Sequence, residues 1–264
     1  MPSDGTLYGS ADTGGSSGNG TVFRVNTDGM GFTVLHTFTA GSSISLAVTN
    51  TGGANPGWGV IVSGNTLYGT TFGGGTEGYG TVFAIRTDGT GFTNLHNFTA
   101  PFHAPATNYD GYSPTAGLIL SGNTLYGTTR FGGPWGEGTI FQLKTDGSGF
   151  SVLYSFAPTG GRPVGGLVLS SNILYGTTTV GGSWNNGSVF SLSLPLPRLT
   201  ISLSGPNVIL AWAANAAGFT LQSTTNLVSQ ATWTPVFPQP VLVNGQNTVT
   251  NQISATEQFY RLIQ

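Results

Sequence analysis

Four acidic residues and one histidine in glycine-rich stretches give this chain a candidate set of catalytic and metal-binding groups. The carboxylates belong to Asp12, Glu77, Asp110 and Glu137, and the imidazole belongs to His103. Carboxylate oxygens, together with Asn and backbone carbonyl oxygens, are the ligands that Ca²⁺ prefers. A bound Ca²⁺ would polarise an ester or lactone carbonyl, while His103 or one of the acids would act as general base on water.

These groups suit two kinds of hydrolase. For a lactone or ester hydrolase, the catalytic candidates are Glu77, Glu137, Asp110 and His103, and the metal candidates are Asp12 and Asp110. Glu77 and Glu137 are also candidates for the carboxylate pair of a glycoside hydrolase, at a separation that the sequence does not give. Lactone or ester hydrolysis is the stronger enzymatic hypothesis, and Ca²⁺ is the cofactor that it requires.

Aromatic residues in the same stretches indicate sugar recognition instead. Aromatic ring faces stack on the C–H surfaces of sugars, and neighbouring amides and acids bond the hydroxyl groups. The ligand-binding candidates are Trp58, Phe72, Tyr79, Tyr109, Tyr112, Arg130, Trp135 and Trp184. We therefore expect a non-catalytic module that binds a glycan or another neutral small ligand, with the Ca²⁺-dependent hydrolase as the alternative.

A structural role is the competing interpretation of these aromatic residues, in which they fill gaps between neighbouring sheets. It is favoured for Trp135 and Trp184, because the two occupy equivalent sites in adjacent repeats. His36 and His96 also share one repeat position, where the next repeat has Tyr154. A histidine that binds a ligand would not easily be replaced by tyrosine in the next repeat, so the two histidines are expected to serve packing or hydrogen bonding.

A repeated unit positions all these residues. The motif LYGTT begins at Leu67, Leu125 and Leu174, and occurs as LYGSA at Leu7. Each copy contains β-prone runs separated by turns of Ser-Gly-Asn or Asp-Gly type and by a glycine-rich loop. In the third copy these runs cover 117–120, 124–129, 139–144 and 150–156. Four strands in meander order cannot bury both faces alone, so the copies are expected to stack.

The repeats end at alternating leucines and prolines, which stiffen a linker and cannot lie inside a central strand. The repeat domain is predicted over 1–194, with units near 6–39, 59–99, 117–157 and 166–193, a Pro-rich linker over 195–198 and a small β-sandwich over 199–264. The first unit lacks its first strand and the fourth lacks its last. The expected sandwich core comprises Trp212, Phe219, Leu221, Trp233 and Tyr260.

Composition excludes several classes of partner. Only 7 basic and 9 acidic residues occur among 264, for a net charge of −2, so neither nucleic acid nor an anionic membrane would be attracted. Cysteine is absent, which excludes disulfides and thiolate metal sites. The sequence contains no run of 18 apolar residues, so membrane insertion is not predicted. The opening residues have no signal-peptide pattern.

The stretches SGNTLYGTT, GTVFAIRTDGTGFTNLHNF and GTIFQLKTDGSGF resemble the GloVer tandem repeat of multi-repeat, surface-anchored proteins of verrucomicrobial and cyanobacterial type. The resemblance covers about residues 6–192. It implies export and an extracellular or cell-surface location, although the chain shows no leader or anchor, and it supplies no catalytic motif. The stretches AGFTLQSTTNL and NGQNTVTN resemble a small β-domain that often closes such proteins.

The order of the strands is similar to that of kelch-type β-propellers, because an aromatic strand precedes each Gly-Gly pair, as Tyr68 precedes Gly73-Gly74. We therefore expect an all-β protein with a β-propeller-like array of about four four-stranded antiparallel sheets, the first and last incomplete, and a C-terminal β-sandwich. The connections between units and the glycine-rich loops should then share one face. Open edges on the incomplete sheets would favour self-association.

Overall fold

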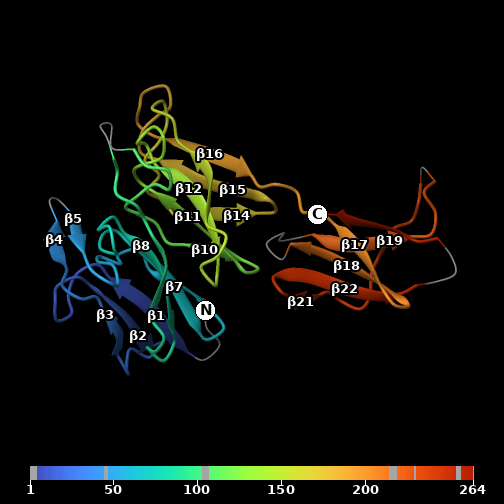
Figure 1. Ribbon diagram of the computed structural model, residues 1–264, viewed down its shortest axis with the longest axis horizontal. Coiled ribbons are helices and arrows are strands. Elements are labelled where there is room, and N and C mark those ends of the chain that lie inside the picture. Colours follow the sequence, from blue (N-terminus) through green and yellow to red (C-terminus); the bar gives the residue numbers. More distant parts are fainter. Residues whose placement is uncertain are drawn as a thin grey trace. The chain divides into compact units, whose positions relative to one another are not determined.

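The computed structural model describes residues 5–44, 47–102, 107–213, 219–228, 230–253 and 257–263, in which every regular element is a β-strand (Figure 1). His103, a predicted general base, lies outside these residues. Contacts divide the chain into two compact units, one of residues 1–120, 125–168 and 175–191, and the other of 121–124, 169–174 and 192–264. No described segment forms a helix of the length and apolar character needed to cross a membrane.

Four antiparallel sheets in meander order form the repeats, as predicted. Within the described residues, the first and fourth sheets have three strands each, and the second and third have four. The two strands that are absent from the described sheets, the first of the first repeat and the last of the fourth repeat, are those for which the sequence has no matching run. The strands are β1 (Thr6–Ala11), β2 (Thr21–Asn26) and β3 (Thr33–Thr37); β6 (Val60–Ser63), β7 (Thr66–Thr71), β8 (Thr81–Arg86) and β9 (Thr93–Asn97); β10 (Ile119–Ser121), β11 (Thr124–Thr129), β12 (Thr139–Lys144) and β13 (Ser151–Ser155); and β14 (Val168–Ser170), β15 (Ile173–Thr178) and β16 (Ser188–Ser193). A short hairpin of β4 (Ser42–Ile44) and β5 (Ala47–Thr49), which was not predicted, follows the first sheet.

The glycine of the LYGTT motif has a packing role. In the second repeat β7 pairs with β8 along its whole length, so Gly69 lies opposite Phe83. A Cβ at Gly69 would approach Phe83 Cζ to 2.5 Å, so any larger residue would displace the ring. The glycine therefore lets each sheet keep a phenylalanine ring flat against its own strand.

Neighbouring sheets bury the faces that they turn towards each other. One core joins Val22 and Phe38 of the first sheet to Leu67, Phe83 and Ile85 of the second. A second core joins the other face of the second sheet to the third. It comprises Tyr68, Val82, Ala84, Phe98, Leu118, Leu125, Phe141 and Leu143. Central strands buried on both sides have few positions for charge, which explains the low charge content of the chain.

Ring stacking reinforces these joints and accounts for the repeated histidines. His36 lies parallel to Phe92 of the next repeat, with ring centroids 3.9 Å apart, and His96 lies parallel to Phe150 at 3.7 Å. Burial lowers the pKa of His36, so this ring is neutral near pH 7. The expected packing role of both histidines is confirmed.

The aspartates of the Asp-Gly turns cap their own turns. The backbone N–H groups of Met30, Thr90 and Ser148 donate to the Oδ1 atoms of the aspartates two residues earlier, each at 2.8 Å. These are Asx-type turns, in which the side chain replaces a backbone acceptor. The Asp-Gly motif therefore fixes the position of the turn between the third and fourth strands of a repeat.

The C-terminal unit packs a four-stranded sheet of order β17-β18-β22-β21 against a three-stranded sheet of order β20-β19-β23. The bounds are β17 (Thr200–Ser204), β18 (Asn207–Ala213), β19 (Thr220–Thr224), β20 (Thr234–Pro235), β21 (Val241–Val243), β22 (Gln246–Gln252) and β23 (Phe259–Ile263). Trp212 and Leu221 lie in the core, with Phe219 and Tyr260 packed against it. Trp233 was predicted there too, but its ring instead carries the Arg261 guanidinium, whose Cζ is 4.2 Å from the ring centroid.

Candidate functional site

The connections between repeats lie beside the glycine-rich loops of the following repeat. Isolated backbone bridges join Ala54 to Gly73 and Tyr112 to Phe131. A third bridge joins Pro163 to Thr178. The two sets of loops are therefore neighbours, as the propeller analogy predicts, and side chains from successive repeats meet where they touch.

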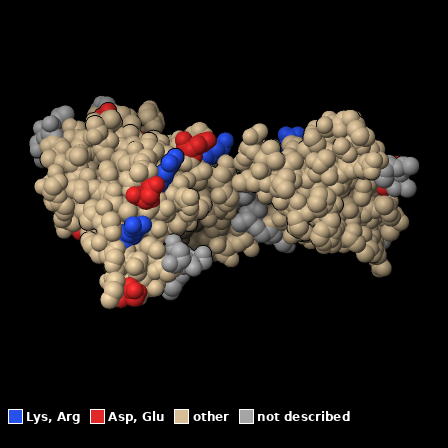
Figure 2. Space-filling view, turned by 90° about the horizontal axis from the view of Figure 1, so that it is seen from below, with Lys and Arg blue, Asp and Glu red and all other residues tan. Residues whose placement is uncertain are grey.

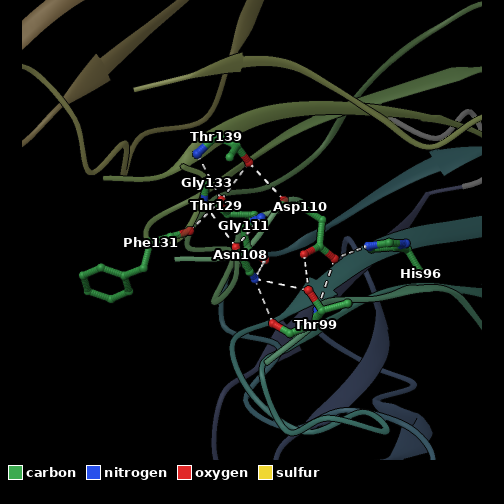
Figure 3. A network of polar contacts seen from close by, with 9 residues as sticks. All are labelled: His96, Thr99, Asn108, Asp110, Gly111, Thr129, Phe131, Gly133 and Thr139. Carbon is green, nitrogen blue, oxygen red and sulfur yellow. Dashed lines mark hydrogen bonds and ion pairs between the residues drawn. The ribbon is translucent and has the colours of Figure 1, made fainter. Parts of the chain in front are cut away.

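An asparagine side chain fixes each of the first two connections, and Figure 3 shows the one in the second connection, Asn108, which is buried. Asn108 Oδ1 accepts hydrogen bonds from the backbone N–H groups of Gly111 and Gly133, at 2.9 and 3.1 Å. Its Nδ2 donates to the carbonyl oxygens of Thr99 and Gly111, at 2.8 and 2.9 Å. Asn50 makes the equivalent bonds one repeat earlier, to Gly53, Gly75 and the Thr39 carbonyl. One side chain thus joins the end of one repeat, the connection and the glycine-rich loop of the next repeat.

Asp110, a predicted catalytic and metal residue, belongs to the same network. Its Oδ2 lies 3.1 Å from His96 Nε2 and 3.1 Å from Thr99 N, and its Oδ1 accepts a bond from the Thr99 hydroxyl. Burial alone would raise the pKa of Asp110, but the hydrogen bonds from His96 and Thr99 outweigh it and hold the pKa below its ordinary value near 3.8. Both carboxylate oxygens are occupied by the protein, which indicates a structural role.

The Asp110 carboxylate should make stability depend on pH. Because its pKa is lower in the folded than in the unfolded chain, its contribution is present above about pH 4 and is lost as the pH falls through the folded pKa. Asp110→Asn should lower the free energy of unfolding by about 1.5–3 kcal/mol at pH 7, and the difference from wild type should shrink towards pH 3. Urea unfolding of both proteins between pH 7 and pH 3 measures this. A difference that stays constant with pH would contradict the role of the charge.

The other predicted acids are not gathered into a metal site. The Glu137 carboxylate is held by Arg162, whose Nε lies 3.0 Å from Oε2, and Glu77 is exposed. When the repeats are matched by their LYGTT motifs, Glu77 corresponds to Trp135 and Glu137 to Tyr79. The acids therefore occupy different places in their loops. In the described residues no three Asp, Glu or His side chains are placed to hold a metal ion together.

A pocket of about 640 Å³ brings together three of the predicted residues. It is lined by Asp12, Asn55, Gly57, Trp58 and Phe72. Asp12 follows β1, the next three lie in the connection after the first repeat, and Phe72 follows β7. The pocket thus lies where the first repeat, the connection and the second repeat meet, and the Trp58 and Phe72 side chains are 44% and 39% exposed.

Hydrogen bonds from the backbone and side chains fix the walls of this pocket. The Asn55 side-chain amide donates to the Asp12 carbonyl oxygen at 2.9 Å. The backbone N–H of Gly59 donates to Ser10 Oγ at 3.0 Å, which holds the chain beside Trp58. Pocket residues on such a frame are pre-organised for a ligand.

The pocket residues differ from their counterparts in the other repeats. Asp12 and Phe72 occupy one repeat position, which holds Arg130 in the third copy and Thr179 in the fourth. Trp58 corresponds to the buried Ala116 and to Gly165. The fold therefore does not require these side chains at these places, and a specific use is the better explanation.

Asn55 and Gly57 are pocket residues that the sequence reasoning missed. Asn55 has a φ of 60° and precedes Pro56, as Ser113 with φ 52° precedes Pro114 and Arg162 with φ 57° precedes Pro163. This repeated residue-proline step was the available signal. It places the residues after each proline next to the glycine-rich loops.

Tyr79, Tyr112 and Arg130 form a separate row between the second and third repeats. The rings of Tyr79 and Tyr112 meet edge to face at 5.4 Å, and Tyr112 stacks on Phe131 at 5.5 Å. Arg130 Cζ lies 5.1 Å from the centre of the Phe131 ring. Burial raises the pKa of Tyr112. Tyr79 and Tyr112 also pack against the second core, so these rings support the joint between two repeats.

Trp135, Trp184 and Tyr109 are exposed. The Trp184 side chain is 86% accessible, and the other two also lie among the exposed large side chains. The interpretation that Trp135 and Trp184 fill gaps between sheets is therefore wrong. Each lies at the tip of a glycine-rich loop, where its ring faces solvent.

Comparison with known families agrees with the repeat pattern. A model described as the Gloeobacter/Verrucomicrobia repeat matches residues 1–205. The chain belongs to this family. The Gloeobacter/Verrucomicrobia repeat match includes all four sheets of the repeat region, and the resemblance seen in SGNTLYGTT is confirmed. No curated protein matches the chain.

Solved structures show only distant similarity to this member of the repeat family. A Nidogen/Laminin complex is 16% identical, with 79% of this chain and 68% of that chain covered, at a TM-score of 0.44. TolB from Acinetobacter baumannii is 14% identical, with 89% and 53% covered, at 0.41. A putative 6-phosphogluconolactonase from Bacteroides uniformis is 14% identical, with 95% and 76% covered, at 0.41. Similarities this weak carry no argument about function.

Proposed function

We propose that the repeat region is a non-catalytic module that binds a glycan or another neutral small ligand, and that the ligand occupies the pocket of Asp12, Asn55, Gly57, Trp58 and Phe72. The observation that carries this proposal is two half-exposed aromatic rings and two polar side chains around one pocket of about 640 Å³. Ligand pockets in proteins commonly have volumes of about 300–1,000 Å³ and combine apolar walls with a few polar groups.

The chemistry of the pocket suits a sugar. The faces of Trp58 and Phe72 offer apolar surface for the C–H groups of a pyranose, and the Asp12 carboxylate accepts hydrogen bonds from hydroxyl groups. The Asn55 amide already donates to the Asp12 backbone, so the acid is held in place before a ligand arrives. A ligand held in this way needs no net charge.

The surface supports a neutral ligand. Only 16 of 264 residues are charged, 7 basic and 9 acidic. Figure 2 shows the visible Lys, Arg, Asp and Glu side chains as small separate groups, with uncharged surface between them. No broad field of one sign would steer an ionic ligand towards the pocket. The family resemblance adds the expectation of an extracellular or cell-surface location, where glycans are abundant partners.

No observation favours the Ca²⁺-dependent hydrolase over this proposal. Arg162 holds Glu137, and His96 and Thr99 hold Asp110. Among the described residues that line the pocket, Asp12 is the one acid. A single carboxylate bonds a hydroxyl group well but is a poor Ca²⁺ site, because this ion takes about six to eight oxygen ligands.

The test is ligand binding by matched tryptophan variants. A neutral glycan array identifies a ligand for the wild-type protein, and titration calorimetry then measures Kd for wild type, Trp58→Ala and Trp184→Ala. Because a buried tryptophan contact is commonly worth 2 kcal/mol or more, Trp58→Ala should weaken binding by about 30-fold or more. Trp184→Ala removes an equally large but remote ring and should leave Kd unchanged.

Two further variants separate binding from catalysis. The double variant Glu77→Gln, Glu137→Gln should bind the same ligand with unchanged Kd, because neither side chain lines the pocket. Binding that depends on Trp184 but not on Trp58 would move the site to the exposed loop tips. Failure of every neutral glycan to bind would refute the glycan as the ligand, and failure of other neutral small molecules as well would refute the proposal.

A further inference from the structure

The joints between repeats are built from the same parts each time. The ring after the Asp-Gly turn is covered by a histidine of the preceding repeat, as His36 covers Phe92 and His96 covers Phe150. The turn itself also packs on the preceding repeat. A Cβ at Gly89 would lie 2.9 Å from the Leu35 carbonyl oxygen, and one at Gly147 would lie 3.2 Å from that of Leu95. Each internal sheet therefore presents one face to the preceding repeat and the other to the following repeat.

In the first sheet, the face that an internal sheet presents to the preceding repeat is uncovered. Leu7 is 41% exposed, whereas its counterparts Leu67, Leu125 and Leu174 are 0% exposed. Phe32 is 62% exposed, and a Cβ at Gly29 in the neighbouring turn would meet nothing within 4 Å. The Phe32 ring nevertheless lies 5.3 Å from Phe23, much as Phe92 lies 5.6 Å from Phe83. The face has the arrangement of an internal joint without a partner.

The fourth sheet leaves the opposite face uncovered. Val189 is 77% exposed, whereas its counterparts Val22, Val82 and Ile140 are 0% exposed. Tyr175 is also exposed, although the equivalent Tyr68 and Tyr126 are buried. In the second repeat this same face, with Tyr68 and Val82, forms the core shared with the third repeat. The fourth sheet therefore presents the half of a joint that fits the half presented by the first sheet.

We propose that these two faces bind each other between copies of the chain, so that the fourth sheet of one copy packs on the first sheet of the next. The occupant is a second copy because the two exposed faces are the complementary halves of a joint that the chain already makes between its own repeats. The face of the first sheet carries Leu7 and Phe32, and the face of the fourth sheet carries Tyr175 and Val189 beside exposed hydroxyl side chains. Burial of the apolar side chains against each other removes hydrophobic surface from water. The contact uses sheet faces, not the sheet edges that the sequence suggested.

This contact is heterologous, since it joins two different patches. Each copy added leaves one free face at either end, so association continues into open chains unless the rotation closes a ring. The fourth sheet has no fourth strand, so the joint lacks the histidine-type stack of the internal joints. We therefore expect reversible association that grows with protein concentration.

The test is analytical ultracentrifugation of the full chain over a wide concentration range. Wild type should shift from monomer to species of two or more copies. Phe32→Asp places a charge on the uncovered face of the first sheet, and Val189→Asp places one on the uncovered face of the fourth sheet. Association would bury this charge without a partner, so each variant alone should remain monomeric, with association at least about 100-fold weaker than that of wild type. Both positions are exposed, so both variants should keep the wild-type circular dichroism spectrum and melting temperature.

Mixing the two variants separates this model from others. The Phe32→Asp variant keeps an unchanged face on its fourth sheet, and the Val189→Asp variant keeps an unchanged face on its first sheet. An equimolar mixture should therefore form dimers and nothing larger. Leu203→Asp, on an exposed strand of the C-terminal unit, is the matched control and should associate like wild type. A wild-type monomer at every concentration, equal loss with Leu203→Asp, or no dimer in the mixture would each overturn the proposal.

Discussion

Gly111→Ala is expected to destabilise the repeat region by about 3–5 kcal/mol. Gly111 has a φ of 83°, and a Cβ there would overlap Thr129 Oγ1 and lie 2.6 Å from Thr139 Oγ1. The two threonines cannot yield easily. Both are fully buried, their hydroxyls share a hydrogen bond of 2.8 Å, and Thr129 Oγ1 also accepts from the Thr139 backbone N–H. Urea unfolding of wild type and variant measures the loss.

Gly29→Ala is the matched control for this experiment. Gly29 has nearly the same φ, 82°, but a Cβ there would meet nothing within 4 Å. Its cost should be the backbone strain alone, about 1–2 kcal/mol. Equal losses for the two variants would show that Gly111 matters for its conformation and not for the close approach of the connection to the third repeat.

Asn108→Ala is the second substitution with a large expected effect, a loss of about 3–5 kcal/mol in the free energy of unfolding. The side chain is buried and satisfies two backbone N–H groups and two carbonyl oxygens drawn from Thr99, Gly111 and Gly133 (Figure 3). Truncation leaves these groups buried without partners, at about 1–3 kcal/mol for each one that water does not reach. Thermal and urea unfolding followed by circular dichroism measure the effect.

The chain provides both a replicate and a control for this prediction. Asn50→Ala removes the equivalent bonds between the first and second repeats and should also destabilise, though less, because Asn50 is partly exposed. Asn185→Ala removes the bond that the N–H of Gly181 donates to an exposed side chain, at a residue with a φ of 55°, and should cost about 1 kcal/mol. A loss at Asn108 no greater than that at Asn185 would contradict the role of the asparagine as a joint between repeats.

Internal repetition separates residues that build this fold from residues that have another use. The glycine opposite each phenylalanine recurs in all four repeats because each needs the same strand pairing, and the turn aspartate recurs in the first three because each makes the same turn. Trp58, Phe72 and Asp12 interrupt that regularity, and the structure places all three around one pocket. A departure from the repeat at a surface position is therefore the best signal for a ligand site in this chain.

Local chemistry in the sequence was sufficient for the strands, the turns and the family. The alternation of apolar residues, the Asp-Gly turns and the LYGTT motif act over a few residues, so they specify strand pairs without knowledge of distant contacts. The missing strands of the first and fourth sheets were also visible, because each repeat could be compared with its neighbours. The short β21 and the β4–β5 hairpin were missed, since a three-residue strand carries too little pattern unless a repeat marks its place, as it does for β10 and β14.

Only the tertiary structure decided which candidate side chains are available to a ligand. Asp110 is bonded to His96 and Glu137 to Arg162, across separations of 14 and 25 residues. Trp135 and Trp184 share a repeat position that suggested packing, yet their rings lie in solvent. Trp58 meets Asp12 and Phe72 because stacking of two repeats brings three separate loops together. Such meetings depend on how whole sheets pack, and no local pattern in the chain specifies them.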